Sequence, residues 1–133
     1  MAVAVALGAL GAHALKTRLA PDMLALWHTA ATYHAWHGLA LLGVGILQLQ
    51  MPQRAGLGRV ALLFVAGIAL FSGSLYAMAL GGGRAWGYVT PFGGFAFIAG
   101  WLLLAYTVAR APRPLTPTLS HFVGEREERE RGR

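Results

Sequence analysis

The residues that could carry out chemistry in this chain are a few histidines, tyrosines and hydroxyl side chains within long apolar stretches. They are His13, Tyr33, His37, Ser72, Ser74, Tyr76 and Thr90. Tyr33 and His37 are four residues apart, as are Ser72 and Tyr76, so each pair shares one face of a helix. Polar groups in hydrocarbon are costly unless they have partners, so they usually face the interior of a helix bundle and often mark a functional site.

Four interpretations of these residues are open at this point. They hydrogen-bond one another and only hold helices together, at about 0.6 kcal/mol for each bond. Alternatively, they line a pocket for a lipid or small molecule, a path for protons or solutes, or a haem or metal site ligated by His13 with His37. We expect no catalytic residue, because the apolar stretches contain no Asp or Glu to act with His37. We also assign no metal and no cofactor.

Four apolar stretches position these side chains, at about residues 1–15, 31–50, 60–80 and 92–109. The last three have about the length, roughly 20 residues, that a helix needs to cross a hydrocarbon core of about 30 Å. The first is shorter and lacks the basic segment of a signal peptide, so we interpret it as a short helix. The 133 residues are 56% hydrophobic and 12% charged. We therefore predict an all-α, integral membrane four-helix bundle over residues 1–110.

Start and stop signals set the bounds of these helices. Pro21 and Asp22 suit the first turn of a helix, which we expect to begin in the interface and to run unbroken to about Gln50. Gly81–Gly83 predicts the end of the third helix, and Thr90 with Pro91 predicts the start of the fourth.

Up-and-down topology brings the polar residues to one side of the membrane. His13 lies near the end of the first helix, Tyr33 and His37 in the first membrane turns of the second, and Ser72, Ser74 and Tyr76 in the last turns of the third. Thr90 begins the fourth helix at the same rim. The sequence thus predicts one polar cluster just inside the non-cytoplasmic leaflet, with His34 solvated near the interface.

Small residues predict where helices approach closely. Ala69, Gly73 and Ala77 form a stripe on the third helix, and Gly38 and Gly45 lie two turns apart on the second. We assign Gly93 and Gly94 of the fourth helix to packing as well. These positions serve either packing within one subunit or contact with a second copy or a partner membrane protein.

The segment 111–133 differs from the rest of the chain, because prolines interrupt it and its acids and arginines leave no apolar face. We predict a disordered charged tail. The net charge of +6 comes from basic residues at span ends or among acids in the tail, which argues against nucleic-acid binding. The arginines near the second loop and the fourth span slightly outnumber the basic residues opposite, which places both termini in the cytoplasm.

Four strings in this order resemble the bacterial family labelled domain of unknown function 423, to which eukaryotic transmembrane protein 256 is similar. They are Gly8–Lys16, Tyr33–His37 followed by Leu39–Leu42, Phe71–Tyr76, and Thr90–Gly94 with Gly100-Trp101. The resemblance covers roughly Leu7–Tyr106. The residues that match the family pattern are His13, Lys16, Tyr33, His37, Ser72, Gly73, Ser74, Tyr76, Pro91, Gly93 and Gly94.

The resemblance implies a small four-helix protein of the bacterial inner membrane with no established activity. The chain departs from the family pattern at its short first helix and in the tail after Pro114. We expect a structural or accessory membrane component rather than an enzyme. The alternative is a binding or transport protein that uses the polar cluster.

Overall fold

The computed structural model describes residues 1–110 and residue 131, so the predicted tail at 111–133 otherwise lies outside the described residues. Within the described part of the chain there are helices and turns and no strand. A π-helical turn joins α3 to α4, and a 3-10 turn precedes α5. The elements are α1 (Ala2–Ala12), α2 (Pro21–Gln50), α3 (Ala55–Gly67), the π-helical turn (Ile68–Ser72), α4 (Gly73–Ala79), the 3-10 turn (Arg84–Tyr88) and α5 (Thr90–Ala109).

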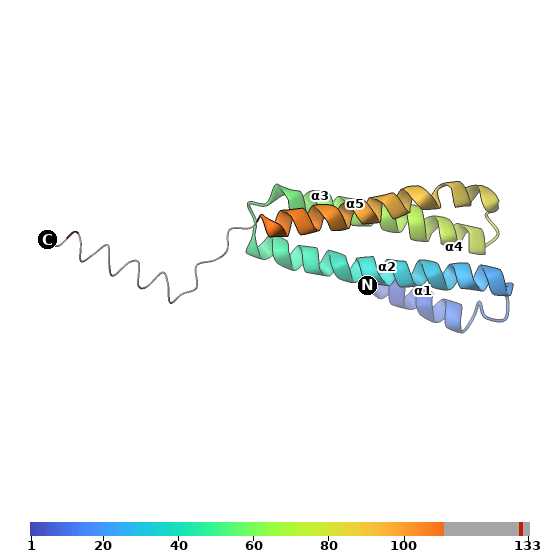
Figure 1. Ribbon diagram of the computed structural model, residues 1–133. Coiled ribbons are helices and arrows are strands. Elements are labelled where there is room, and N and C mark those ends of the chain that lie inside the picture. Colours follow the sequence, from blue (N-terminus) through green and yellow to red (C-terminus); the bar gives the residue numbers. More distant parts are fainter. Residues whose placement is uncertain (111–130, 132–133) are drawn as a thin grey trace.

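These elements form four rods, because α3, the π-helical turn and α4 make one continuous helix of 25 residues, Ala55–Ala79 (Figure 1). The predicted all-α four-helix bundle is confirmed. Helix α2 packs against α1, α3 and α4, and α5 packs along α3 and the π-helical turn. Figure 1 shows the N-terminus lying partway along α2, so α1 covers only part of that helix.

The two N-terminal helices differ in how closely they follow the sequence pattern. Helix α2 starts at Pro21 and runs unbroken for 30 residues to Gln50, as predicted. Helix α1 stops at Ala12 after 11 residues, about 16 Å, and is shorter than the apolar stretch at 1–15. Hydrogen bonds from Leu15 N–H to Leu10 O and from Leu19 N–H to Leu15 O form the turns that lead back to α2.

The third rod begins at Ala55, before the predicted start at residue 60, and ends close to the predicted stop. Gly81 has a φ of +90°, which a glycine adopts at little cost. Gly82 N–H donates to Ala77 O and Gly81 N–H donates to Met78 O. These two bonds satisfy carbonyls at the end of α4 that have no partner within the helix. Glycine therefore ends the third rod and turns the chain toward α5.

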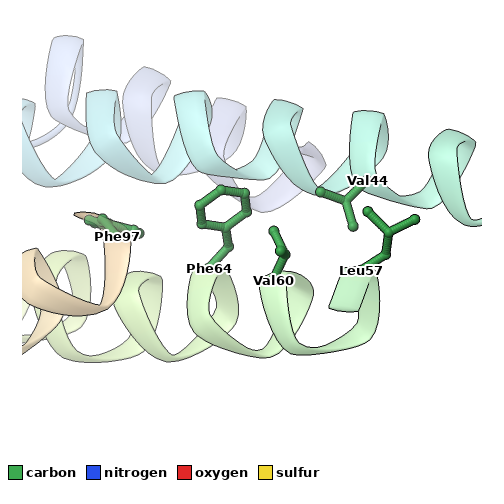
Figure 2. Close-up of a cluster of buried hydrophobic side chains, with 5 residues drawn as sticks. All are labelled: Val44, Leu57, Val60, Phe64 and Phe97. Atoms are coloured by element: carbon green, nitrogen blue, oxygen red, sulfur yellow. The ribbon is translucent and has the colours of Figure 1, made fainter. Parts of the chain in front are cut away.

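The hydrophobic core lies between α2, α3 and α5. Val44, Leu57, Val60, Phe64 and Phe97 are each at most 4% exposed. Figure 2 shows their side chains filling the space between these helices. Outside this core, large apolar side chains cover the surface of the rods, and Leu62, Phe95 and Leu102 are each 68% exposed.

Two helices, Ala55–Ala79 and Arg84–Ala109, are long and apolar enough to cross a membrane. Only 33% and 22% of their most apolar windows are buried inside the protein. A core helix of a water-soluble protein would bury most of such a window, so the exposed apolar side chains of these two helices are suited to lipid contact.

Candidate functional site

His37 sits in the middle of α2 and both of its ring nitrogens have partners. Nδ1 lies 2.9 Å from Tyr33 O, and Trp101 Nε1–H donates to Nε2 over 3.2 Å. A carbonyl oxygen can only accept, so Nδ1 carries the proton and donates it, and Nε2 is the acceptor. The two bonds require a neutral imidazole and connect α2 to α5.

Aromatic rings enclose the His37 imidazole. Phe97 stacks on it with ring centroids 3.5 Å apart and planes at 13°, and Phe64 meets it edge-on at 5.5 Å. Tyr33 lies one turn away on α2 with its centroid at 6.1 Å. His37 is 4% exposed as a result.

An open pocket of about 390 Å³ lies beside this imidazole, between α2 and α5. Its mouth is formed by side chains that are largely exposed: Trp36 at 61%, Ile98 at 58% and Trp101 at 48%. We call it the aromatic pocket. Its lining residues are Tyr33, Trp36, His37, Phe71, Gly94, Phe97, Ile98 and Trp101.

Ser74 and Thr90 form a second, separate polar contact. Their hydroxyl oxygens are 2.8 Å apart, and Ser74 Oγ also donates to Phe71 O over 2.9 Å. Ser74 is 1% exposed. This pair connects α4 to the start of α5 and has no free hydrogen-bonding group directed at a ligand, so its arrangement is that of a link between helices.

Ser72, Tyr76 and His34 form a third group on the side where α2 meets α4. The Ser72 Oγ, Tyr76 Oη and His34 Nδ1 atoms are all buried without a hydrogen-bond partner. The His34 and Tyr76 rings meet edge-on with centroids 6.4 Å apart. The expectation that His34 is solvated therefore does not hold for Nδ1, because the packing of α2 against its neighbours covers that atom.

His13 does not join any of these groups. It is exposed and follows the last residue of α1, whereas Met1 at the other end of α1 lies against Gly38, next to His37. The 11 residues of α1 separate the two histidines by about 16 Å along the bundle. The predicted single cluster is thus three separate groups. Ligation of one haem or metal by His13 with His37 does not fit this geometry, and residues 1–110 hold no cluster of three potential metal ligands.

The predicted packing residues divide into those at close contacts and those on open surface. A methyl group at Gly93 would collide with the Phe71 backbone, and one at Gly38 would lie 3.1 Å from Met1 Sδ. Gly94 has only an ordinary contact at 4.0 Å. The predicted stripe of small residues on the third rod does not form a close contact with another helix. Ala69 is exposed, and a methyl group at Gly73 would meet only Ile68 O, at 3.9 Å. Gly45 has no neighbour within 4 Å, and Ala77 is half-buried.

The sequence interpretation missed several glycines that do receive a side chain from another helix. Phe97 presses on Gly67, Phe64 on Gly100, and Thr107 on Gly56. Glycines occur throughout the spans, so a glycine pattern alone does not say which ones face a neighbour. The large side chains on the opposite helix decide that.

Two tryptophans were also missed as site residues. Trp101 lies four residues after Phe97 and supplies the hydrogen bond to His37, and Trp27 Nε1–H donates to Leu7 O over 2.8 Å. Trp27 reaches that carbonyl because Gly11 has no side chain, and a methyl group there would lie 2.5 Å from the indole. A buried indole N–H usually finds a partner, which was the available signal for both residues.

The amino-acid sequence also matches a known protein family. Residues 7–94 match the family described as "Protein of unknown function (DUF423)". No solved structure matches this chain significantly.

Similar proteins support the same assignment. A UPF0382 membrane protein of Staphylococcus saprophyticus is 44% identical over 102 residues, which cover 77% of this chain and 83% of that protein. The UPF0382 membrane protein YwdK of Bacillus subtilis is 37% identical over 108 residues, 81% of this chain and 88% of that protein. The UPF0382 inner membrane protein YgdD of Escherichia coli K12 is 39% identical over 111 residues, 82% of each chain. This chain is therefore a membrane protein of the DUF423 family, whose function is unknown.

Proposed function

We propose that this protein is a non-enzymatic accessory component of the inner membrane that acts by binding a lipid-soluble molecule with a flat ring in the aromatic pocket. The observation that carries the proposal is the pocket itself, an open site of about 390 Å³ between α2 and α5. Six of its lining residues, Tyr33, Trp36, His37, Phe71, Phe97 and Trp101, have aromatic rings.

The location of the pocket selects ligands that are dissolved in the membrane. Phe97 belongs to the α5 span, and the exposed Trp36 and Trp101 side chains form the mouth. A molecule with a flat ring can stack on these rings in offset or edge-on contacts, each worth about 0.5–1.5 kcal/mol. An aliphatic chain has no ring and could not make these stacking contacts.

The polar groups of the pocket favour a ring that carries an oxygen acceptor. Trp101 lies at the mouth, 48% exposed, and its indole N–H donates to His37 Nε2 at 3.2 Å. A ligand carbonyl or hydroxyl oxygen can replace His37 Nε2 as the acceptor of this bond. Few precisely placed polar groups on an apolar wall are typical of small-molecule sites.

The non-enzymatic assignment rests on the side chains near His37. Asp22 is the only carboxylate side chain among residues 1–110, and it lies in the first turn of α2, about four turns from His37. The hydrogen bonds of His37 occupy both ring nitrogens. Among residues 1–110 no carboxylate is therefore placed to act with this histidine.

The binding proposal can be tested with menadione, a ring-bearing quinone, added to the purified protein in detergent. The chain has four tryptophans, two of them in the pocket, so we expect saturable quenching of tryptophan fluorescence. Trp36→Phe and Trp101→Phe should each reduce the quenching. Trp86→Phe is the matched control, because Trp86 lies in the 3-10 turn outside the pocket, and it should keep the quenching.

A pocket-filling variant separates binding from simple partition into the micelle. Gly94 lines the pocket and a methyl group there has only one contact, at 4.0 Å, so Gly94→Leu can occupy the space without disturbing α5. We expect it to weaken menadione binding about tenfold, which corresponds to 1.4 kcal/mol. Equal quenching of the wild type and Gly94→Leu would refute the pocket as the site.

The orientation in the membrane is part of the same proposal. Arg54, Arg59 and Arg110 lie at one end of the bundle, where Arg54 donates to Arg110 O over 2.9 Å, and Lys16, Arg18 and Arg84 lie at the other. Together with Arg113 in the sequence, the first set is larger, which favours both termini in the cytoplasm. Reporter fusions after Arg110 and within the 3-10 turn would test it, with cytoplasmic signal expected only for the first.

Contact with a second copy is a further part of the proposal. The side of the third rod that carries Ala69 and Gly73 is free of close contacts with the other helices. A small-residue surface of this kind permits close approach of another helix. The native mass in a mild detergent, compared between the wild type and Gly73→Leu, tests this, and a monomeric wild type would exclude it.

A further inference from the structure

Three buried polar atoms without partners lie on the side of α2 that faces α4, away from the aromatic pocket. They are Ser72 Oγ, Tyr76 Oη and His34 Nδ1. Ser72 is 0% exposed. A buried polar group that loses its hydrogen bond keeps the full cost of leaving water, so such groups are rare in native proteins and call for a partner.

Ser72 is the last residue of the π-helical turn and has no hydrogen-bond partner within its own helix. Four other Ser and Thr side chains of residues 1–110 bond to a carbonyl three or four residues earlier, namely Thr29, Ser74, Thr90 and Thr107. For Ser72 the carbonyl four residues earlier is Ile68 O, which accepts the N–H of Gly73 in the π-helical turn. The Ser72 hydroxyl, at the end of that turn, has no hydrogen-bond partner.

Tyr76 lies beside His34 and one helical turn beyond Ser72. Because Tyr76 follows Ser72 by four residues, both occupy one face of the third rod. The Tyr76 ring lies 4.6 Å from Trp27 and 6.4 Å from His34, measured between centroids. Tyr76 therefore lies along α2 between these two residues.

The facing part of α2 carries short side chains. Between Trp27 and His34, the buried residues are Ala30 and Ala31, at 0% and 8% exposure. Methyl groups leave more room beneath the Tyr76 ring than larger side chains would. The site is polar on one side and has small residues on the other, as a site for a buried water requires.

We propose that these three groups hold buried water between α2 and α4. Each of the two hydroxyls can donate and accept, and an imidazole nitrogen can do either, according to its tautomer. Water is the small molecule that satisfies such a mixture, since it makes two to four hydrogen bonds of about 2.8 Å at once. The water completes the contact between α2 and the third rod at the point where the π-helical turn ends.

The first test is the sign of the stability change when one partner is removed. If water is bound, Tyr76→Phe removes a formed hydrogen bond and should raise the unfolding equilibrium constant about fivefold. If the hydroxyl is an orphan, the same change relieves its burial and should lower that constant. Tyr106→Phe is the matched control, because Tyr106 is 54% exposed on α5, and it should change little.

A double-mutant cycle sharpens this test. Ser72→Ala and Tyr76→Phe should be coupled if both groups bind the same water, so the double variant should lose less than the product of the two single effects. Ser74→Ala combined with Tyr76→Phe is the control pair, because Ser74 is bonded to Thr90 instead. Multiplicative effects in the Ser72–Tyr76 pair would overturn a shared water.

If a variant does not fold, the water can still be sought directly in the wild-type protein. Magnetisation transfer from water to the Tyr76 hydroxyl, observed by NMR on the wild-type protein, is expected. A high-resolution structure should show an ordered water within hydrogen-bond distance of Ser72 and Tyr76. A dry site, or a direct bond between the Tyr76 hydroxyl and His34 or Ser72, would overturn it.

Discussion

Where α5 crosses the third rod, glycines receive the opposing helix, and where α2 meets α4, aromatic rings separate the two helices. At the α5 interface, Gly93 lies against the Phe71 backbone and Gly67 against the Phe97 ring. At the α2–α4 interface, Trp27 packs on Tyr76 with centroids 4.6 Å apart. The polar side chains at the first interface are paired, and three polar atoms at the second are not.

The difference shows that a polar group pairs only where the facing helix supplies a partner within reach. Glycine lets two helices approach until short hydroxyl side chains such as Ser74 and Thr90 reach each other, at 2.8 Å. The buried residues of α2 between Trp27 and His34 are Ala30 and Ala31, whose methyl groups can neither donate nor accept a hydrogen bond. We expect substitutions at the α5 interface to act through steric overlap and those at the α2–α4 interface through lost hydrogen bonds.

The largest expected effect is at Gly93. In Gly93→Ala the new methyl group overlaps the Phe71 backbone, which cannot move aside as the end of a side chain can. Overpacking of this kind should lower the free energy of unfolding by about 3 kcal/mol, measured by chemical or thermal unfolding in detergent. A variant as stable as the wild type would show that α5 is not held this closely.

The two histidines of α2 should respond unequally. His37→Ala removes two hydrogen bonds and the ring stacked on Phe97, so we expect a loss of about 3 kcal/mol. His34→Ala removes the ring that meets Tyr76 edge-on and the nitrogen that we propose binds the buried water, and should cost about 1 kcal/mol. Unfolding of the two variants under identical conditions checks the ratio. Equal losses would contradict the contrast between the two faces of α2.

Trp27→Phe should loosen α1 with little effect on the rest of the bundle. The change keeps the ring against Tyr76 and removes the N–H that donates to Leu7 O. The expected loss is about 1 kcal/mol, confined to α1. Faster amide hydrogen exchange in α1, with unchanged exchange in α5, is the measurement. Uniform acceleration in both helices would mean that α1 and the bundle open together.

The smallest effect, of opposite sign, is expected at Gly45. A methyl group at this position has no neighbour within 4 Å, so Gly45→Ala meets no steric barrier. Alanine favours the helix by about 0.5–1 kcal/mol over glycine, and the unfolding midpoint should rise. A clear destabilisation would show that Gly45 contacts a second copy or a partner protein in the membrane.

The sequence pattern anticipated the helices better than the contacts between them. The unbroken α2 from Pro21 and the stop at Gly81 follow from local signals, namely proline in the first turn and a positive φ at the end. The start of α3 at Ala55 was missed, because two glycines and Arg59 precede the apolar stretch and these residues are helical nonetheless. The π-helical turn at Ile68–Ser72 carries no local signal that the sequence analysis used.

The candidate site residues stay a prediction, and the structure does not gather them in one cluster. Their depth in the membrane follows from the sequence, but depth does not say which way each side chain points around its helix. Tyr33 and His37 do lie together, yet His37 turns to Trp101 on α5 while Tyr76 turns to Trp27 on α2.

Composition and local signals alone determine that this chain is a helical membrane protein, where α2 begins and where the third rod ends, and that Asp22 is the only carboxylate side chain among residues 1–110. These properties depend on the transfer of each segment from water to lipid and on backbone geometry, which are local. The tertiary structure decided which glycines face a ring, which nitrogen of His37 bonds to Trp101, and which hydroxyls have no partner. Such pairings depend on how each helix is rotated about its axis, and only the packing of all four rods together sets that rotation.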